Sequence, residues 1–64
     1  MYNCWNEAVK YLYDKNGQIK KRISEEIATK MKLLMNQYYY GIQAKKELYY
    51  FLVDLGVINL VESN

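Results

Sequence analysis

The side chains that most often carry catalysis are scarce in this sequence of 64 residues. It contains no histidine and a single cysteine, Cys4. Histidine-based acid–base catalysis is therefore excluded, and one cysteine cannot supply the ligands of a zinc site. No glycine-rich phosphate-binding loop is present either. We therefore expect no enzymatic activity, no metal and no other cofactor.

Glu25 and Glu26 form the only pair of adjacent carboxylates. Neighbouring residues on a helix point about 100° apart, so the two groups do not converge as an acid and a base would. Carboxylates in the first turn instead complement the helix dipole, and Ser24, a preferred N-cap residue, stands directly before them. These three residues predict the start of a helix rather than an active site.

Basic residues gather at two places in the sequence. Lys20, Lys21 and Arg22 are consecutive, and Lys45 and Lys46 lie early in the last expected helix. Lysine and arginine neutralise phosphates, and their local grouping matters more for this than the net charge, which is only +2. These five residues are the candidate nucleic-acid contacts, with an ordinary solvated surface as the alternative for each group.

Tyrosine is frequent, with eight residues. We expect Tyr49 to pack in the core, whereas so small a domain cannot bury Tyr38, Tyr39, Tyr40 and Tyr50 together. Exposed tyrosines form protein interfaces or stack on unpaired bases, and partial burial with hydrated hydroxyl groups is the third interpretation. These four tyrosines are the candidates for partner binding or base stacking.

The hydrophobic pattern predicts three helices that must position these groups. Apolar residues at i, i+3, i+4 and i+7 indicate a helix over about residues 5–15, ended by Asn16 and Gly17. A second helix is expected over residues 25–35. In the third, Gly56 follows the last apolar position, as a helix C-terminus requires. Its apolar stripe consists of Leu48, Phe51, Leu52 and Leu55.

Two segments between and after these helices are open to more than one interpretation. Residues 18–22 are expected to form a short strand before a helix that begins at Ser24, and the alternative is one long helix from Ile19 to Met35. Residues 38–41 are a connector or the first turn of the third helix. After Gly56, aliphatic residues 57–61 predict a closing strand, which could pair with residues 18–22.

Two stretches resemble the winged helix-turn-helix family. Residues 24–28 are similar to the opening of the second helix in those domains, and residues 49–58 are similar to the end of the recognition helix and its turn into the wing. The family pattern in the second stretch is matched by Tyr49, Leu52, Gly56, Val57 and Ile58.

This resemblance spans nearly the whole chain. It implies one mainly α domain, residues 1–64, with three helices and a minimal two-stranded β element; a plain three-helix bundle is the alternative. Between Ile27 and Gly56 the chain is about two helical turns longer than the family pattern. At most one strand fits after Gly56, so the wing is expected to be shortened or missing.

Together, the resemblance and the basic residues predict a small DNA-binding accessory protein that assists replication with a protein partner, on single-stranded or duplex DNA. Abundant Tyr, Lys, Asn and Ile fits an AT-rich coding sequence, as in phages and mobile genetic elements. A dimeric duplex-DNA repressor is the first alternative. A pure protein-interaction module, such as a small phage inhibitor of a host enzyme, is the second.

The remaining expectations concern partners and location. No apolar run approaches the roughly 20 residues of a membrane span, and no secretory signal is visible. One cysteine fits a reducing compartment. We therefore expect a cytoplasmic protein with DNA and either a larger replication protein or a second copy as partners, and with neither a membrane nor a small-molecule substrate.

Overall fold

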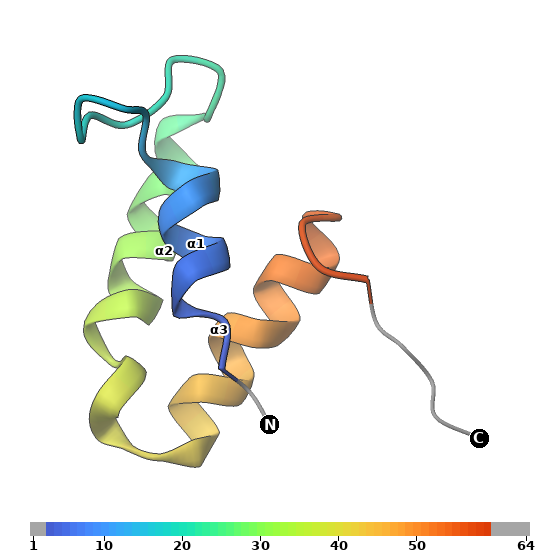
Figure 1. The fold of residues 1–64 in the computed structure, drawn as a ribbon. Coiled ribbons are helices and arrows are strands. Elements are labelled where there is room, and N and C mark those ends of the chain that lie inside the picture. Colours follow the sequence, from blue (N-terminus) through green and yellow to red (C-terminus); the bar gives the residue numbers. More distant parts are fainter. Residues whose placement is uncertain (1–2, 60–64) are drawn as a thin grey trace.

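The computed structural model describes residues 3–59, and in this range the chain forms three α-helices: α1 (Trp5–Leu12), α2 (Glu25–Asn36) and α3 (Ile42–Asp54). A 3-10 turn, η1 (Tyr38–Tyr40), joins the last two. In Figure 1, α1 and α2 run antiparallel beside each other, and α3 leaves the end of α2 obliquely. The expected mainly helical fold with three helices is confirmed. Within residues 3–59, none of the helices has the length and apolar character needed to cross a membrane.

The first helix ends three residues earlier than the predicted residue 15, because Asp14 folds the next residues into a turn. Its carboxylate accepts hydrogen bonds from the backbone N–H groups of Asn16 at 2.8 Å and Gln18 at 3.0 Å. Side chains of Asp commonly form such turns in competition with helix continuation. This turn sends the chain back toward the end of α1.

The strand expected at residues 18–22 is reduced to a single antiparallel bridge, which Ile19 forms with Tyr13. Among the described residues no longer strand is present. The alternative of a continuous helix from Ile19 to Met35 is wrong, since the chain is not helical between the bridge and Ser24.

The predicted start of α2 is confirmed. Ser24 is the N-cap, and its hydroxyl oxygen accepts a hydrogen bond of 3.3 Å from the backbone N–H of Ile27, with Glu25 and Glu26 in the first turn. The helix continues to Asn36, one residue beyond the expectation.

Glycines bound α3 at both ends. Gly41 precedes it with φ 146°, and Gly56 follows it with φ 79°. The N–H of Gly56 donates to the Val53 carbonyl oxygen and that of Val57 to the Leu52 carbonyl oxygen, each at 3.0 Å. This is the pairing of a Schellman motif, in which the residue after the helix must tolerate positive φ. The predicted stop is confirmed, and residues 38–41 are a connector.

The strand expected at residues 57–61 is not seen in the described part of the chain. Val57 and Ile58 belong to the turn that closes α3. Residues 60 and 61 lie outside the described range.

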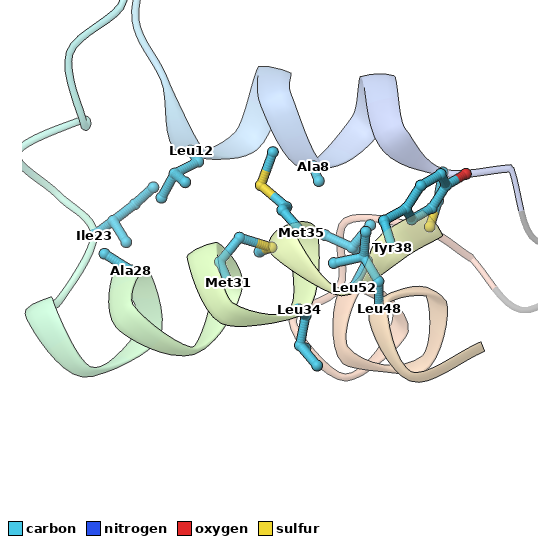
Figure 2. Packing of buried hydrophobic residues seen from close by; sticks show 11 residues of the cluster. Ala8, Leu12, Ile23, Ala28, Met31, Leu34, Met35, Tyr38, Leu48 and Leu52 are labelled. Atoms are coloured by element: carbon cyan, nitrogen blue, oxygen red, sulfur yellow. The ribbon is translucent and has the colours of Figure 1, made fainter. Parts of the chain in front are cut away.

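The core lies between α1 and α2 and is closed from the side by α3 (Figure 2). Leu48 and Leu52 of the predicted stripe are fully buried, whereas Phe51 and Leu55 are half-buried. Tyr38 of η1 also reaches the core and is only 4% exposed. The completely buried side chains are Ala8, Leu12, Met31, Leu48 and Leu52.

Candidate nucleic-acid interface

Three aromatic rings meet beside the N-terminal end of α1, one from α1 and two from η1. The ring centroids of Trp5 and Tyr38 are 5.3 Å apart, those of Trp5 and Tyr39 are 5.9 Å apart, and Tyr38 and Tyr39 pack edge to face at 5.2 Å. The Tyr38 hydroxyl donates a hydrogen bond of 3.2 Å to Asn3 Oδ1. The fold therefore joins residues more than 30 positions apart into one cluster.

This cluster borders an open groove of about 610 Å³, which we call the aromatic groove. One exposed ring, Tyr39, and the partly exposed Trp5 form its aromatic surface, and two asparagine carboxamides lie beside them. Among the described residues, no carboxylate lines it. The lining residues are Asn3, Trp5, Asn6, Tyr38, Tyr39, Gly41, Ile42 and Lys45.

Lys45 supplies the positive charge of the aromatic groove. Its ammonium group is 5.3 Å from the centroid of the Tyr38 ring, a cation–π distance. Gly41 makes this approach possible, because its φ of 146° turns the chain from η1 into α3 so that the first turn of α3 returns to the rings. A half-buried cation next to aromatic faces suits an anionic ligand that has a flat part.

The four candidate tyrosines do not form one surface. Tyr38 is a buried core residue, whereas Tyr39 and Tyr40 are 75% and 83% exposed. Tyr40 does not line the aromatic groove. Tyr50 lies on α3, where its ring contacts that of Tyr49 with centroids 5.4 Å apart.

The basic residues 20–22 lie far from the aromatic groove. In Figure 1 their loop is at the top, above the start of α2, whereas α3 begins at the bottom. Lys20 donates from Nζ to the Lys10 carbonyl oxygen at 2.6 Å, and the Arg22 guanidinium lies 5.3 Å from the Tyr11 ring centroid. Lys21 is exposed. The structure therefore separates Lys20, Lys21 and Arg22 from Lys45.

Lys46 faces a second groove, of about 320 Å³, between α2 and α3. Glu47 and Asp54 also line this groove and offset the charges of Lys30 and Lys46. Its charged side chains balance, so the groove offers no excess positive charge to the phosphates of duplex DNA. We call it the α2–α3 groove; it is lined by Lys30, Leu34, Gln43, Lys46, Glu47, Tyr50, Phe51 and Asp54.

Cys4 does not contribute a reactive group. Its side chain is 1% exposed, and burial, assisted by the charge of Glu7, raises the pKa of the thiol. A thiol that stays protonated is a poor nucleophile.

Sequence reasoning missed Trp5, Asn3, Asn6 and Ile42 as groove residues. Trp5 begins the apolar pattern of residues 5–15, which accounts for its packing against the core but not for its place in the groove. The available signal was local: the single tryptophan of the chain stands between two asparagines near the start of a helix. Its juxtaposition with residues 38, 39 and 45 depends on the tertiary fold.

No family model, curated protein or solved structure matches this chain.

Proposed function

We propose that this domain binds single-stranded DNA through the aromatic groove, as an accessory protein of a phage or mobile genetic element that assists replication with a protein partner. The observation that carries the proposal is the placement of Lys45 beside the Trp5–Tyr38–Tyr39 cluster in a groove without a described carboxylate.

Each part of the groove matches one part of a nucleotide. The accessible faces of Trp5 and Tyr39 offer surfaces on which unpaired bases stack. The Lys45 ammonium attracts a phosphate, and the carboxamides of Asn3 and Asn6 supply donors and acceptors for base edges. The volume of the groove is within the usual range for small-ligand pockets, about 300–1,000 Å³.

We favour single strands over duplex because of the charges on α3. Glu47 and Asp54 offset Lys30 and Lys46 in the α2–α3 groove, and the two basic groups lie at opposite ends of α2. A winged-helix relationship remains part of the proposal, supported by the order of helices and by the glycine stop of α3. In that case the domain would use its η1 connector rather than a wing or a recognition helix.

Fluorescence anisotropy with labelled single-stranded and duplex oligonucleotides over a salt series tests this function. Tyr39→Ser should weaken single-strand binding by about 1–3 kcal/mol, the usual contribution of one stacked base, with little effect on duplex. Tyr40→Ser is the matched control, since Tyr40 is adjacent and also highly exposed but lies outside the groove.

A second pair of variants tests the electrostatic contribution to DNA binding. Lys45→Ala should weaken binding to any sequence and flatten the dependence of log affinity on log salt by about 0.7, the value for one lost phosphate contact with a single strand. Lys21→Ala should leave this slope unchanged, because Lys21 lies at the far end of the molecule. Trp5, the single tryptophan, reports stacking directly through quenching of its fluorescence.

A protein-interaction module is the second candidate, and the exposure of Tyr39, Tyr40 and Ile42 favours it. These three apolar side chains are 75%, 83% and 55% exposed, and exposed aromatic side chains are typical of protein interfaces. If no salt-sensitive binding to either form of DNA occurs at micromolar concentration, with or without a co-purified partner, the DNA proposal is wrong. Loss of the partner in both Tyr39→Ser and Tyr40→Ser would then support the interaction module.

A further inference from the structure

We propose that Asn3 makes the aromatic groove selective for bases with a carbonyl oxygen, as in thymine and guanine, over bases with an amino group at the same ring position, as in cytosine and adenine. Tyr38 is the positioning residue that fixes Asn3 for this role. The inference rests on the proposed binding of single strands in this groove, and it adds the class of base that the groove accepts.

A hydrogen bond to a buried side chain fixes the Asn3 carboxamide. The Tyr38 hydroxyl donates to Asn3 Oδ1 at 3.2 Å, and Tyr38 is only 4% exposed. Ring contacts with Trp5 and Tyr39, at centroid distances of 5.3 and 5.2 Å, hold Tyr38 in place. The Asn3 oxygen therefore has a partner within the fold, whereas the amide nitrogen offers two N–H donors to a ligand.

The other polar groups of the aromatic groove do not oppose this preference. The Trp5 indole and the Lys45 ammonium can only donate hydrogen bonds. Tyr39 and Asn6 are exposed, and each can donate or accept. The Gly41 carbonyl oxygen already accepts from the Lys45 backbone N–H at 3.2 Å. Since no carboxylate of the described residues lines the groove, donors outnumber acceptors there.

The two classes of base differ in what they offer to such donors. Thymine and guanine carry a carbonyl oxygen where cytosine and adenine carry an amino group. An asparagine that pairs with adenine uses both its oxygen and its nitrogen, and the oxygen of Asn3 is already bonded to Tyr38. An amino group that faces the Asn3 N–H donors would be left without an acceptor, which lowers affinity.

Fluorescence anisotropy with labelled single strands measures the preference. Each strand is a short chain of abasic sites with the same base at a few central positions, and a strand without bases gives the contribution of the phosphates. Uracil is compared with cytosine, and hypoxanthine with adenine, so that ring size is constant within each pair. The wild-type chain should bind the carbonyl member of each pair about two- to tenfold more tightly, the effect of one hydrogen bond.

Three variants assign the preference to its residues. Asn3→Asp replaces the amide donor with an acceptor, so it should weaken binding to all strands and reverse the order within each pair. Tyr38→Phe removes only the hydroxyl, so Asn3 can turn and the two members of a pair should bind nearly equally. Asn6→Ala, in the same groove, is the matched control and should keep the wild-type ratio. Circular dichroism must show that each variant is folded.

The outcomes separate this inference from the proposed function. Equal or reversed affinities within the pairs for the wild-type chain, or a ratio that Asn3→Asp leaves unchanged, overturn the base preference while single-strand binding stands. A wild-type ratio in Tyr38→Phe overturns the positioning role of Tyr38. Absence of salt-sensitive binding to any single strand, natural ones included, overturns the proposed function and the base preference with it.

Discussion

The ammonium group of Lys20 donates a hydrogen bond of 2.6 Å to the backbone carbonyl oxygen of Lys10, in the last turn of α1. Carbonyl groups in that turn lack partners within the helix and carry its negative dipole end. Lys20, in the following loop, therefore caps the C-terminal end of α1. The sequence alone suggests that its charge binds phosphate.

Replacing this lysine should affect folding more than DNA binding. Lys20→Met keeps the aliphatic part of the side chain but removes the charge, and should lower the free energy of unfolding by about 0.5–1.5 kcal/mol. Lys21→Met, at the exposed neighbouring position, should change it by less than about 0.5 kcal/mol. Urea denaturation followed by circular dichroism measures both; equal effects would mean that the capping contact contributes nothing.

Leu52 is the residue on which the packing of α3 depends most. Leu52→Ala should cost about 2–5 kcal/mol, as for other fully buried leucines. Because a domain of this size has only a few kcal/mol of stability, the variant should be largely unfolded at 37 °C. Leu33→Ala is the matched control: Leu33 is 54% exposed, so its thermal melt should stay close to that of the wild type. An unchanged melt for Leu52→Ala would contradict the core described above.

Because Gly56 has a positive φ, Gly56→Val should destabilise the fold more than Gly56→Asn. A Cβ atom at this position meets no atom within 4 Å, so the cost comes from the backbone alone. Gly56→Val should lower the free energy of unfolding by about 1–3 kcal/mol, whereas Gly56→Asn should be milder because asparagine tolerates left-handed backbone. Chemical denaturation of both variants checks the order, and equal losses would argue against this turn.

Cys4 predicts how stability responds to alkaline pH. Burial raises the pKa of its thiol above the ordinary value of 9.0, so the folded chain keeps the proton where the unfolded chain loses it. The unfolded state then binds fewer protons, and the free energy of unfolding falls as pH rises above about 9; below that pH the contribution is fully present. Cys4→Ala should show a smaller decline above about pH 9 in urea titrations. Identical declines would show that the thiol is not responsible.

The helix ends that depend on residues close together in the sequence were predictable. Ser24 and Ile27 form a cap within one turn, and Gly56 ends a helix whose stripe contains Leu52. The end of α1 was predicted too late, because the apolar period alone does not reveal that the Asp14 carboxylate binds the backbone of the next turn.

The candidate site was predictable only as residue types. Tyr39 and Lys45 are candidate binding residues on residue type alone, and their meeting with Trp5 in one groove depends on how the connector folds back on α1. Lys20 is a second example. Its charge is evident from the sequence, but its hydrogen bond to the Lys10 carbonyl oxygen at the end of α1 is not. Long side chains reach partners that spacing along one helix does not specify.

The order of the helices along the chain has a consequence for how fast the chain folds. α1 and α2 are neighbours in sequence as well as in space, as are α2 and α3, and helical domains with such local contacts fold in microseconds to milliseconds. The chain has no proline, so no prolyl isomerisation should add a slow phase. The contact of Trp5 with Tyr38 joins two distant parts of the sequence and cannot form before α1 and the connector dock. The fluorescence of the single tryptophan should therefore follow the assembly of the aromatic groove as the closing event of refolding.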